Sequence, residues 1–128
     1  MHWKLKALLK VINYIGPTRQ VELSEIKEER KKNNRVSALG QFLFDDKVNV
    51  NSIVDSKIEH LPIRIYKNNK NEDQKVIIYF HGGGFCFYGI ESHDYICRRL
   101  SKMNECTVIS VDYRLAPEHV FPSAQEDA

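Results

Sequence analysis

The sequence predicts an α/β fold in which strands of a mostly parallel sheet alternate with helices. Residues 76–80 (VIIYF) are apolar and rich in β-branched and aromatic side chains, and so are residues 107–111 (TVISV). Runs of this kind are typical of strands that are buried on both faces. Between the two runs, Ile96, Leu100 and Met103 recur at helical spacing. A strand, a helix and a second strand in this order form the crossover unit of a parallel sheet.

Composition limits the class of protein. With 128 residues, 42% of them hydrophobic, the chain can bury one core. Its 19 basic and 17 acidic residues leave a net charge of +2, which gives no reason to expect nucleic acid as a partner. No apolar segment is long enough to span a bilayer, and the one near the amino terminus is too short for a signal-peptide core. Three cysteines without framework spacing favour reduced thiols. We therefore expect a soluble, cytoplasmic protein.

The first part of the chain, residues 1–45, predicts helices. Residues 3–15 place apolar side chains near one helical face with lysines opposite, and Gly16-Pro17 ends that helix. A second helix is expected over residues 21–32, because its acidic residues come first and its basic residues late, as the helix dipole favours. Residues 41–44 form a short apolar stretch.

The second part, residues 46–128, contains the predicted sheet. Residues 48–54 favour a weak strand, whereas residues 63–66 alternate as a half-buried strand. Residues 67–75 are polar and rich in asparagine, which predicts a surface loop.

The most informative stretch is the glycine loop, residues 81–85 (HGGGF), directly after the run at 76–80. Three successive glycines permit unusual dihedral angles and let the backbone approach a ligand closely. Such a backbone can point N–H donors at a negatively charged oxygen. The alternative is a flexible turn between a strand and a helix. Ser92 is expected to cap the helix that follows, with Asp94 in its first turn.

A second block makes the pattern specific. Residues 111–119 (VDYRLAPEH) and 121–124 (FPSA) follow the glycine loop. In order and separation, these blocks resemble the hormone-sensitive-lipase-type carboxylesterases, a branch of the α/β-hydrolase fold. The resemblance covers roughly residues 48–128. It implies a helical cap over residues 1–45, followed by the first strands and first crossover of an α/β-hydrolase domain over residues 46–128.

The resemblance also implies roles for the glycine loop. Gly83 and Gly84 would donate backbone N–H groups to an oxyanion, while Gly82 shapes the turn. His81 would brace the loop through hydrogen bonds rather than act as a base.

Two nearby aromatic residues are candidates for lining a substrate pocket, Phe85 and Tyr88. The family usually has a glycine where Tyr88 stands, and this chain has Gly89 immediately after it. The overall spacing of the motif is nevertheless kept, so we expect the loop to survive with a changed tip.

Charged residues in the second block have two interpretations. Asp112, Arg114 and Glu118 can be imagined as an acid–base constellation, but we expect them to fix the following loop through ion pairs and backbone hydrogen bonds. Asp127 fits a structural carboxylate of the family pattern. The resemblance also implies two cis peptide bonds, at Ala116–Pro117 and Phe121–Pro122.

Two further interpretations remain open. A His/Cys cluster suggests zinc, but its spacing fits none of the usual ligand patterns, and we expect no metal or cofactor. The cluster consists of His81, Cys86, His93 and Cys97. The basic amphipathic segment 3–15 could lie on a membrane surface, but we favour a cap helix that packs over an active-site cleft.

A serine esterase needs a nucleophile, and these 128 residues contain no G-x-S-x-G motif. In this fold the triad order is serine, acid, histidine, so we expect all three after Ala128. The chain would then supply the oxyanion loop of an enzyme acting on a small-molecule ester, would be inactive alone, and would need a carboxyl-terminal half as its partner. The alternative is a stand-alone binding protein without catalytic activity. A downstream reading frame that encodes G-x-S-x-G would decide between them.

Overall fold

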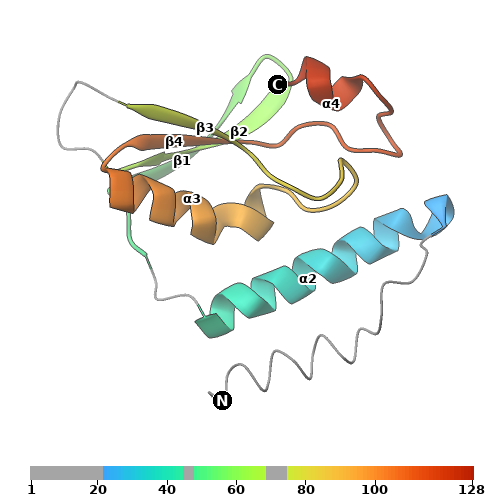
Figure 1. Ribbon diagram of the computed structural model, residues 1–128, viewed down its shortest axis with the longest axis horizontal. Helices are drawn as coiled ribbons and strands as arrows, with labels where there is room; N and C mark the ends of the chain where they lie inside the picture. Colours follow the sequence, from blue (N-terminus) through green and yellow to red (C-terminus); the bar gives the residue numbers. More distant parts are fainter. Residues whose placement is uncertain (1–21, 45–47, 69–74) are drawn as a thin grey trace.

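The computed structural model describes residues 22–44, 48–68 and 75–128. Within these ranges, one four-stranded sheet has helices on both sides (Figure 1). The strands are β1 (Ser52–Ile58), β2 (Leu61–Lys67), β3 (Val76–Phe80) and β4 (Thr107–Val111). The helices are the short 3-10 helix η1 (Leu23–Glu25) and the α-helices α2 (Ile26–Phe44), α3 (Ile90–Asn104) and α4 (Ser123–Glu126).

The sheet has the strand order β1-β2-β4-β3. β1 and β2 form an antiparallel hairpin, and β2 also pairs antiparallel with β4. β3 runs parallel to β4, and α3 connects the two strands. The crossover unit predicted from residues 76–111 is therefore confirmed. Because β4 lies between β2 and β3, it is the most buried strand, and Val108 and Ser110 are both fully buried.

One face of the sheet is covered by α3, and α2 lies outside α3 as a second layer (Figure 1). Tyr66 and Val108 point from the sheet into this layer and pack with Cys97 of α3 and with Cys106. All four side chains are at most 1% exposed. This cluster is the main core of the described chain, because close-packed apolar burial is the dominant stabilising term.

The opposite face is only partly covered. Ile63 and Val111 pack with Tyr113 and reach Ala124 of α4. Farther along the same face, α4 no longer shields the sheet, and Ile78 of β3 is 60% exposed. The sheet therefore has one closed face and one largely open apolar face.

The helix predicted over residues 21–32 is longer in the structure. α2 continues from Ile26 to Phe44, through the charged segment and through the apolar stretch at 41–44. The ion pair between Lys31 and Glu28, at 2.9 Å and three residues apart, supports its exposed face. Gly40, with open space around its Cα, does not interrupt the helix. The helix predicted at residues 3–15 and most of the loop at 67–75 lie outside the described residues.

Two other boundaries were also wrong. The weak strand expected at 48–54 is β1, and it begins at Ser52 because pairing with β2 sets its register. The crossover helix begins at Ile90, so Ser92 lies inside it. Ser92 is not the N-cap residue but takes part in capping from position N3, because its hydroxyl accepts a hydrogen bond from the N–H of Gly89, the N-cap residue, at 3.0 Å. Both Pro bonds expected to be cis, Ala116–Pro117 and Phe121–Pro122, are cis.

Candidate functional site

The connection between β3 and α3, residues 81–89, is built around a tight turn at Gly83. The carbonyl oxygen of Gly83 accepts hydrogen bonds from the N–H groups of Cys86 and Phe87, at 3.2 and 3.0 Å. Gly83 has a φ of +128°. A Cβ atom at Gly83 would lie 2.2 Å from the carbonyl oxygen of Phe87. Glycine is therefore required here by both conformation and space.

The same turn leaves two backbone donors unused. Among the described residues, none accepts a hydrogen bond from the N–H of Gly83 or of Gly84. Gly84 has a φ of +60° and open space around its Cα, and the residue is exposed. Unpaired backbone N–H groups are rare in folded proteins unless solvent or a ligand reaches them. The two adjacent donors are thus available to a bound acceptor.

His81 is held between the loop and the residues that follow β4. Its side chain is 3% exposed, and its ring stacks on Tyr113 with centroids 4.3 Å apart. The Tyr113 hydroxyl donates a hydrogen bond to the His81 carbonyl oxygen. Nδ1 of His81 lies 2.8 Å from the carbonyl oxygen of Gly82. Because a carbonyl can only accept, Nδ1 carries the proton in this contact, and Nε2 keeps its lone pair in the neutral ring.

Phe85 and Tyr88 have different aromatic neighbours. Phe85 is 53% exposed and lies with its ring at an edge angle to Tyr113. Tyr88 has a φ of 74°, the left-handed conformation that glycine adopts at low cost. Its ring meets that of His93 edge-on, with centroids 5.6 Å apart. The backbone therefore follows a path suited to glycine although the side chain is large.

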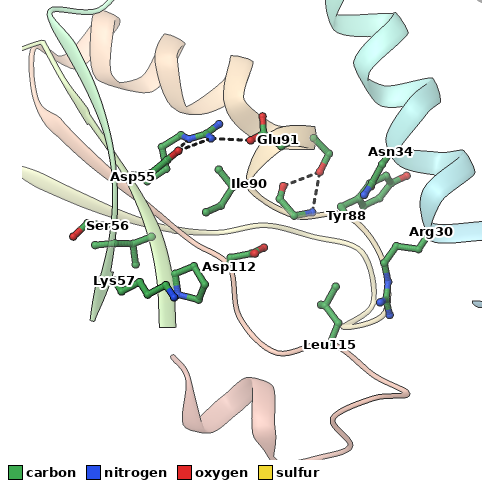
Figure 2. A pocket seen from close by; sticks show the side chains of 15 residues that line it. Arg30, Asn34, Asp55, Ser56, Lys57, Tyr88, Ile90, Glu91, Asp112 and Leu115 are labelled. Carbon is green, nitrogen blue, oxygen red and sulfur yellow. Dashed lines mark hydrogen bonds and ion pairs between the residues drawn. The ribbon is translucent and has the colours of Figure 1, made fainter. Parts of the chain in front are cut away.

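A cavity of about 700 Å³ lies beside this connection, between α2, the β1–β2 hairpin and the start of α3 (Figure 2). Tyr88 and Gly89 line it from the connection before α3, Asp112 lines it from the segment after β4, and Arg30 and Asn34 line it from α2. The unused donors at 83 and 84 are not among its lining residues. Of the two aromatic residues, only Tyr88 borders this cavity.

The three charged residues of the second block do not converge. The Asp112 carboxylate accepts a hydrogen bond from the N–H of Ile90, and burial raises its pKa. Arg114 pairs with Asp127, and Glu118 pairs with Arg30. These contacts hold separate parts of the chain together.

Asp127 is the most enclosed of these carboxylates. Its side chain is 1% exposed and accepts hydrogen bonds from the backbone N–H and the Nε of Arg114. His60 lies 3.3 Å away. The hydrogen bonds from Arg114 lower the pKa of Asp127 to about 2, although burial opposes this shift. The carboxylate joins α4 to the segment after β4 and to the turn of the β1–β2 hairpin.

Sequence analysis did not identify the role of Arg30, which lies on α2. Its Nε donates to the carbonyl oxygen of Cys86 and its NH2 group donates to that of Ala116, both at 2.7 Å. The same guanidinium pairs with Glu118 at 3.0 Å. These hydrogen bonds from Arg30 lower the pKa of Glu118 to about 2. In the sequence, Arg30 is one of several basic residues in a charged helix, and no local pattern distinguishes it.

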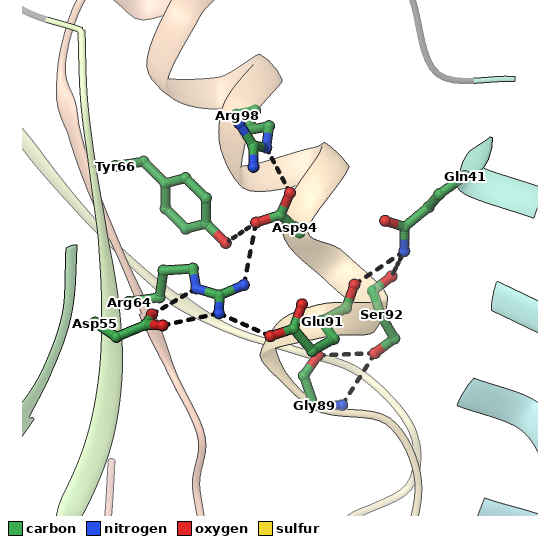
Figure 3. Close-up of polar contacts among 9 residues, drawn as sticks. All are labelled: Gln41, Asp55, Arg64, Tyr66, Gly89, Glu91, Ser92, Asp94 and Arg98. Carbon is green, nitrogen blue, oxygen red and sulfur yellow. Dashed lines mark hydrogen bonds and ion pairs between the residues drawn. The ribbon is translucent and has the colours of Figure 1, made fainter. Parts of the chain in front are cut away.

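A second polar network joins the sheet to α3 (Figure 3). Arg64 of β2 bonds Asp55 of β1 at 2.6 Å and Glu91 of α3 at 2.7 Å. Asp94 accepts a hydrogen bond from the buried Tyr66 hydroxyl at 2.8 Å and pairs with Arg98. Burial and the neighbouring Asp94 raise the pKa of Tyr66, so this hydroxyl stays protonated as a donor.

α2 also contacts this network. Gln41 donates hydrogen bonds to the carbonyl oxygens of Ser92, at 2.8 Å, and Glu91, at 3.1 Å (Figure 3). The network therefore fixes the first turn of α3, and with it the end of the glycine-rich connection.

The predicted His/Cys cluster does not form a metal-binding arrangement. The His81 and His93 rings stack with centroids 5.5 Å apart, and Cys97 is buried in the core. Burial raises the pKa of Cys97 to about 11, so its thiol stays protonated. In the described ranges, no group of three or more His, Cys, Asp or Glu side chains could hold a metal ion. None of the helices described in these ranges is both long and apolar enough to cross a membrane.

The sheet order, the crossover and the position of the glycine loop after β3 define the class of fold. Residues 77–128 match the model of a protein family described as having the alpha/beta hydrolase fold. A solved hyperthermophilic esterase from Pyrobaculum calidifontis superposes with a TM-score of 0.80 and 31% identity, over 95% of this chain and 39% of that chain. A solved thermostable carboxylesterase from a metagenomic library gives a TM-score of 0.73 and 38% identity, over 80% of this chain and 35% of that chain.

Curated esterases resemble this chain in sequence. An arylesterase of Saccharolobus solfataricus is 43% identical over 105 residues, covering 80% of this chain and 34% of the arylesterase. An esterase of Mycobacterium tuberculosis is 43% identical over 82 residues, covering 62% of this chain and 26% of that esterase. The chain is similar to the amino-terminal region of α/β-hydrolase carboxylesterases. It spans about a third of the length of the arylesterase.

Proposed function

We propose that this chain is the oxyanion-binding part of a carboxylic-ester hydrolase. The observation that carries the proposal is the pair of adjacent backbone donors at Gly83 and Gly84, which no described residue uses. They follow β3 on a turn that only glycine can make at position 83. Donors fixed in advance stabilise the negative charge that develops on an ester carbonyl during attack. The esterase names of the relatives support the same reaction class.

The other residues of the connection have supporting roles in this proposal. His81 braces the loop, because its ring is stacked on Tyr113 and its Nδ1 proton is committed to the Gly82 carbonyl. Gly82 needs no special conformation, because it has neither a positive φ nor a close contact at its Cα. Phe85 and Tyr88 are candidates for the substrate pocket, Phe85 because it is exposed beside the free donors and Tyr88 because it borders the cavity. The substrate would be a small-molecule ester.

The nucleophile is the missing element. The 128 residues contain no serine in a G-x-S-x-G motif, so an oxyanion site here lacks the covalent route to hydrolysis. We infer that residues 1–128 are inactive alone and act with a carboxyl-terminal half that carries serine, acid and histidine. The alternative is a binding protein derived from a hydrolase, in which the same two donors hold a carboxylate or a similar anion.

A chimera tests the proposal. Residues 1–128 replace the matching amino-terminal part of the S. solfataricus arylesterase, and hydrolysis of a short-chain p-nitrophenyl ester is measured. We expect a folded, active chimera that a serine-directed phosphonate inactivates stoichiometrically, and residues 1–128 alone should show no saturable, phosphonate-sensitive turnover. Gly83→Ala in the chimera should lower kcat by about 10²–10³, the usual cost of an oxyanion donor.

Gly82→Ala is the matched control, because its Cα has open space and no special dihedral angle. It should leave kcat within a small factor of the unmodified chimera. Equal kcat in the chimera and its folded Gly83→Ala variant would refute the oxyanion role. Anion binding by residues 1–128, together with a folded chimera that has no activity, would favour the binding-protein alternative.

A further inference from the structure

Arg30 lies where three segments that are distant in sequence meet. It belongs to α2, and its guanidinium reaches the carbonyl oxygens of Cys86 and Ala116 and the carboxylate of Glu118. The sequence separations are 56, 86 and 88 residues. The side chain is only 19% exposed, so solvent competes weakly for these bonds. Hydrogen bonds from a charged guanidinium are among the strong ones in proteins.

Cys86 links the turn at Gly83 to Arg30. Cys86 and Phe87 donate their N–H groups to the Gly83 carbonyl and thereby close the turn. Arg30 holds the opposite side of the same residue, the Cys86 carbonyl. A further backbone bond, from the Ala116 N–H to the Phe85 carbonyl at 2.8 Å, ties the turn to the segment that Arg30 also holds. The turn is therefore fixed from outside as well as from within.

The turn that Arg30 supports contains residues in unfavourable backbone conformations. Phe85 and Tyr88 both have positive φ angles, 60° and 74°, although neither is glycine. Such conformations are unfavourable for L-residues and persist only where surrounding contacts enforce them. Cys86 lies between them, and its carbonyl is the atom that Arg30 binds.

We propose that Arg30 is a positioning residue, through which α2 keeps the turn at Gly83 in the conformation that leaves the Gly83 and Gly84 N–H groups free. The catalytic meaning of this conformation rests on the proposed function. The conformational claim itself concerns residues 1–128 alone, and its test measures no hydrolysis. Failure of the conformational claim about Arg30 can therefore be distinguished from failure of the proposed esterase function.

The chain provides its own reporters. Cys86 lies in the turn and is partly exposed, whereas Cys97 and Cys106 are buried in the core at 0% and 1% exposure. The experiment measures alkylation of each thiol by mass spectrometry, and amide hydrogen exchange at Cys86 and Phe87 by NMR. Release of the turn affects only the Cys86 thiol and these two amides, whereas global unfolding exposes all three thiols together.

In Arg30→Ala, we expect alkylation of Cys86 and exchange of the two amides to accelerate about tenfold, because two charge-assisted hydrogen bonds are lost. Cys97 and Cys106 should stay protected. Lys31→Ala is the matched control, since Lys31 lies on the same helix and, among the described residues, pairs locally with Glu28. It should leave all rates unchanged. Unchanged exchange at Cys86 and Phe87 in folded Arg30→Ala would overturn the proposal.

Two further variants make the test decisive. Glu118→Gln removes the ion pair but leaves both carbonyl bonds to Arg30, so the turn should stay protected. If this variant releases the turn as fully as Arg30→Ala, the support comes from residue 118 and the proposal is wrong. If Arg30→Ala unfolds the chain, Arg30→Lys decides. An ammonium can keep the pair with Glu118 but cannot reproduce the guanidinium fork. Faster exchange of the two amides in this variant supports the proposal, and unchanged exchange refutes it.

Discussion

Gly82 and Gly83 are neighbours in the sequence with very different requirements in the fold. Gly83 has a positive φ, and a Cβ atom there would collide with the Phe87 carbonyl oxygen. Gly82 has neither restriction. A triple glycine in a sequence therefore contains positions of unequal importance, and only the path of the backbone distinguishes them.

This difference predicts a difference in stability. In residues 1–128, Gly83→Ala should lower the free energy of unfolding by about 2 kcal/mol or more, because it combines a strained backbone with a steric clash. Gly82→Ala should change it by less than about 0.5 kcal/mol, as an exposed substitution does. Urea denaturation of both variants measures the effect. Similar free energies for the two variants would show that the turn at Gly83 is not built as described.

Single residues also show what sequence analysis could not reach. The position of the glycine loop directly after a strand was predicted, because the residues that indicate it are adjacent in the sequence. Arg30 was not, because its partners are 56 to 88 residues away and nothing in a charged helix marks one arginine among its neighbours. For the left-handed backbone at Tyr88, the signal was the glycine that the resembling family usually has there, since a tyrosine by itself does not indicate a glycine-like conformation.

At the scale of elements, the small helix α4 is attached by Asp127 and Arg114. The pKa of Asp127 is about 2, below its ordinary value of 3.8, and that of Glu118 is about 2, below 4.5. In both cases the folded state binds protons less readily than the unfolded state. Their contribution to stability is therefore complete above the ordinary values and is lost as pH falls from 4.5 towards 2. Asp112 changes the pH dependence of stability in the opposite direction, because burial raises its pKa and the folded state therefore binds this proton more readily.

The Asp127 contribution can be isolated by substitution. Asp127→Asn should be less stable than the unmodified chain at pH 7 and should lose less stability on acidification from pH 4 to pH 2. Glu126→Gln is the control, because Glu126 meets the same arginine from a 59% exposed position. Unfolding free energies across this pH range measure both. Parallel pH curves for Asp127→Asn and the unmodified chain would contradict the assignment.

The elements themselves were predicted with uneven success, and for physical reasons. β3, α3 and β4 were identified because buried strands and a helical stripe leave strong periodic signals. β1 and the end of α2 were misplaced because their limits depend on partners. Pairing with β2 fixes β1, and the carboxyl-terminal part of α2 is held by Gln41 against the first turn of α3.

At the scale of the whole molecule, the sheet ends in an open edge and an open face. Within the described chain, β3 pairs with β4 alone. Val76, Ile78 and Phe80 of β3 are 51%, 60% and 40% exposed, on the part of this face that α4 does not reach. An unpaired apolar edge without proline or inward charge is a template for pairing with another chain. An apolar face of this kind marks an interaction surface or a risk of aggregation.

We therefore expect residues 1–128 alone to bind a hydrophobic dye and to associate with increasing concentration in size-exclusion chromatography with light scattering. Ile78→Lys, at the most exposed of these positions, should reduce both effects without unfolding the sheet, because a lysine on an edge strand opposes pairing. A monodisperse monomer with strongly protected amides at residues 77–80 would contradict this expectation and would favour a stand-alone protein.

The contacts of Arg30 also have a consequence for synthesis of the chain. The arginine is made 88 residues before Glu118. At about 5–20 residues per second, a ribosome needs roughly 4 to 18 s to add those residues. During that interval α2 exists without the full set of segments that hold it in place. The first α-helix of the described chain is therefore among the last described parts to reach its final position.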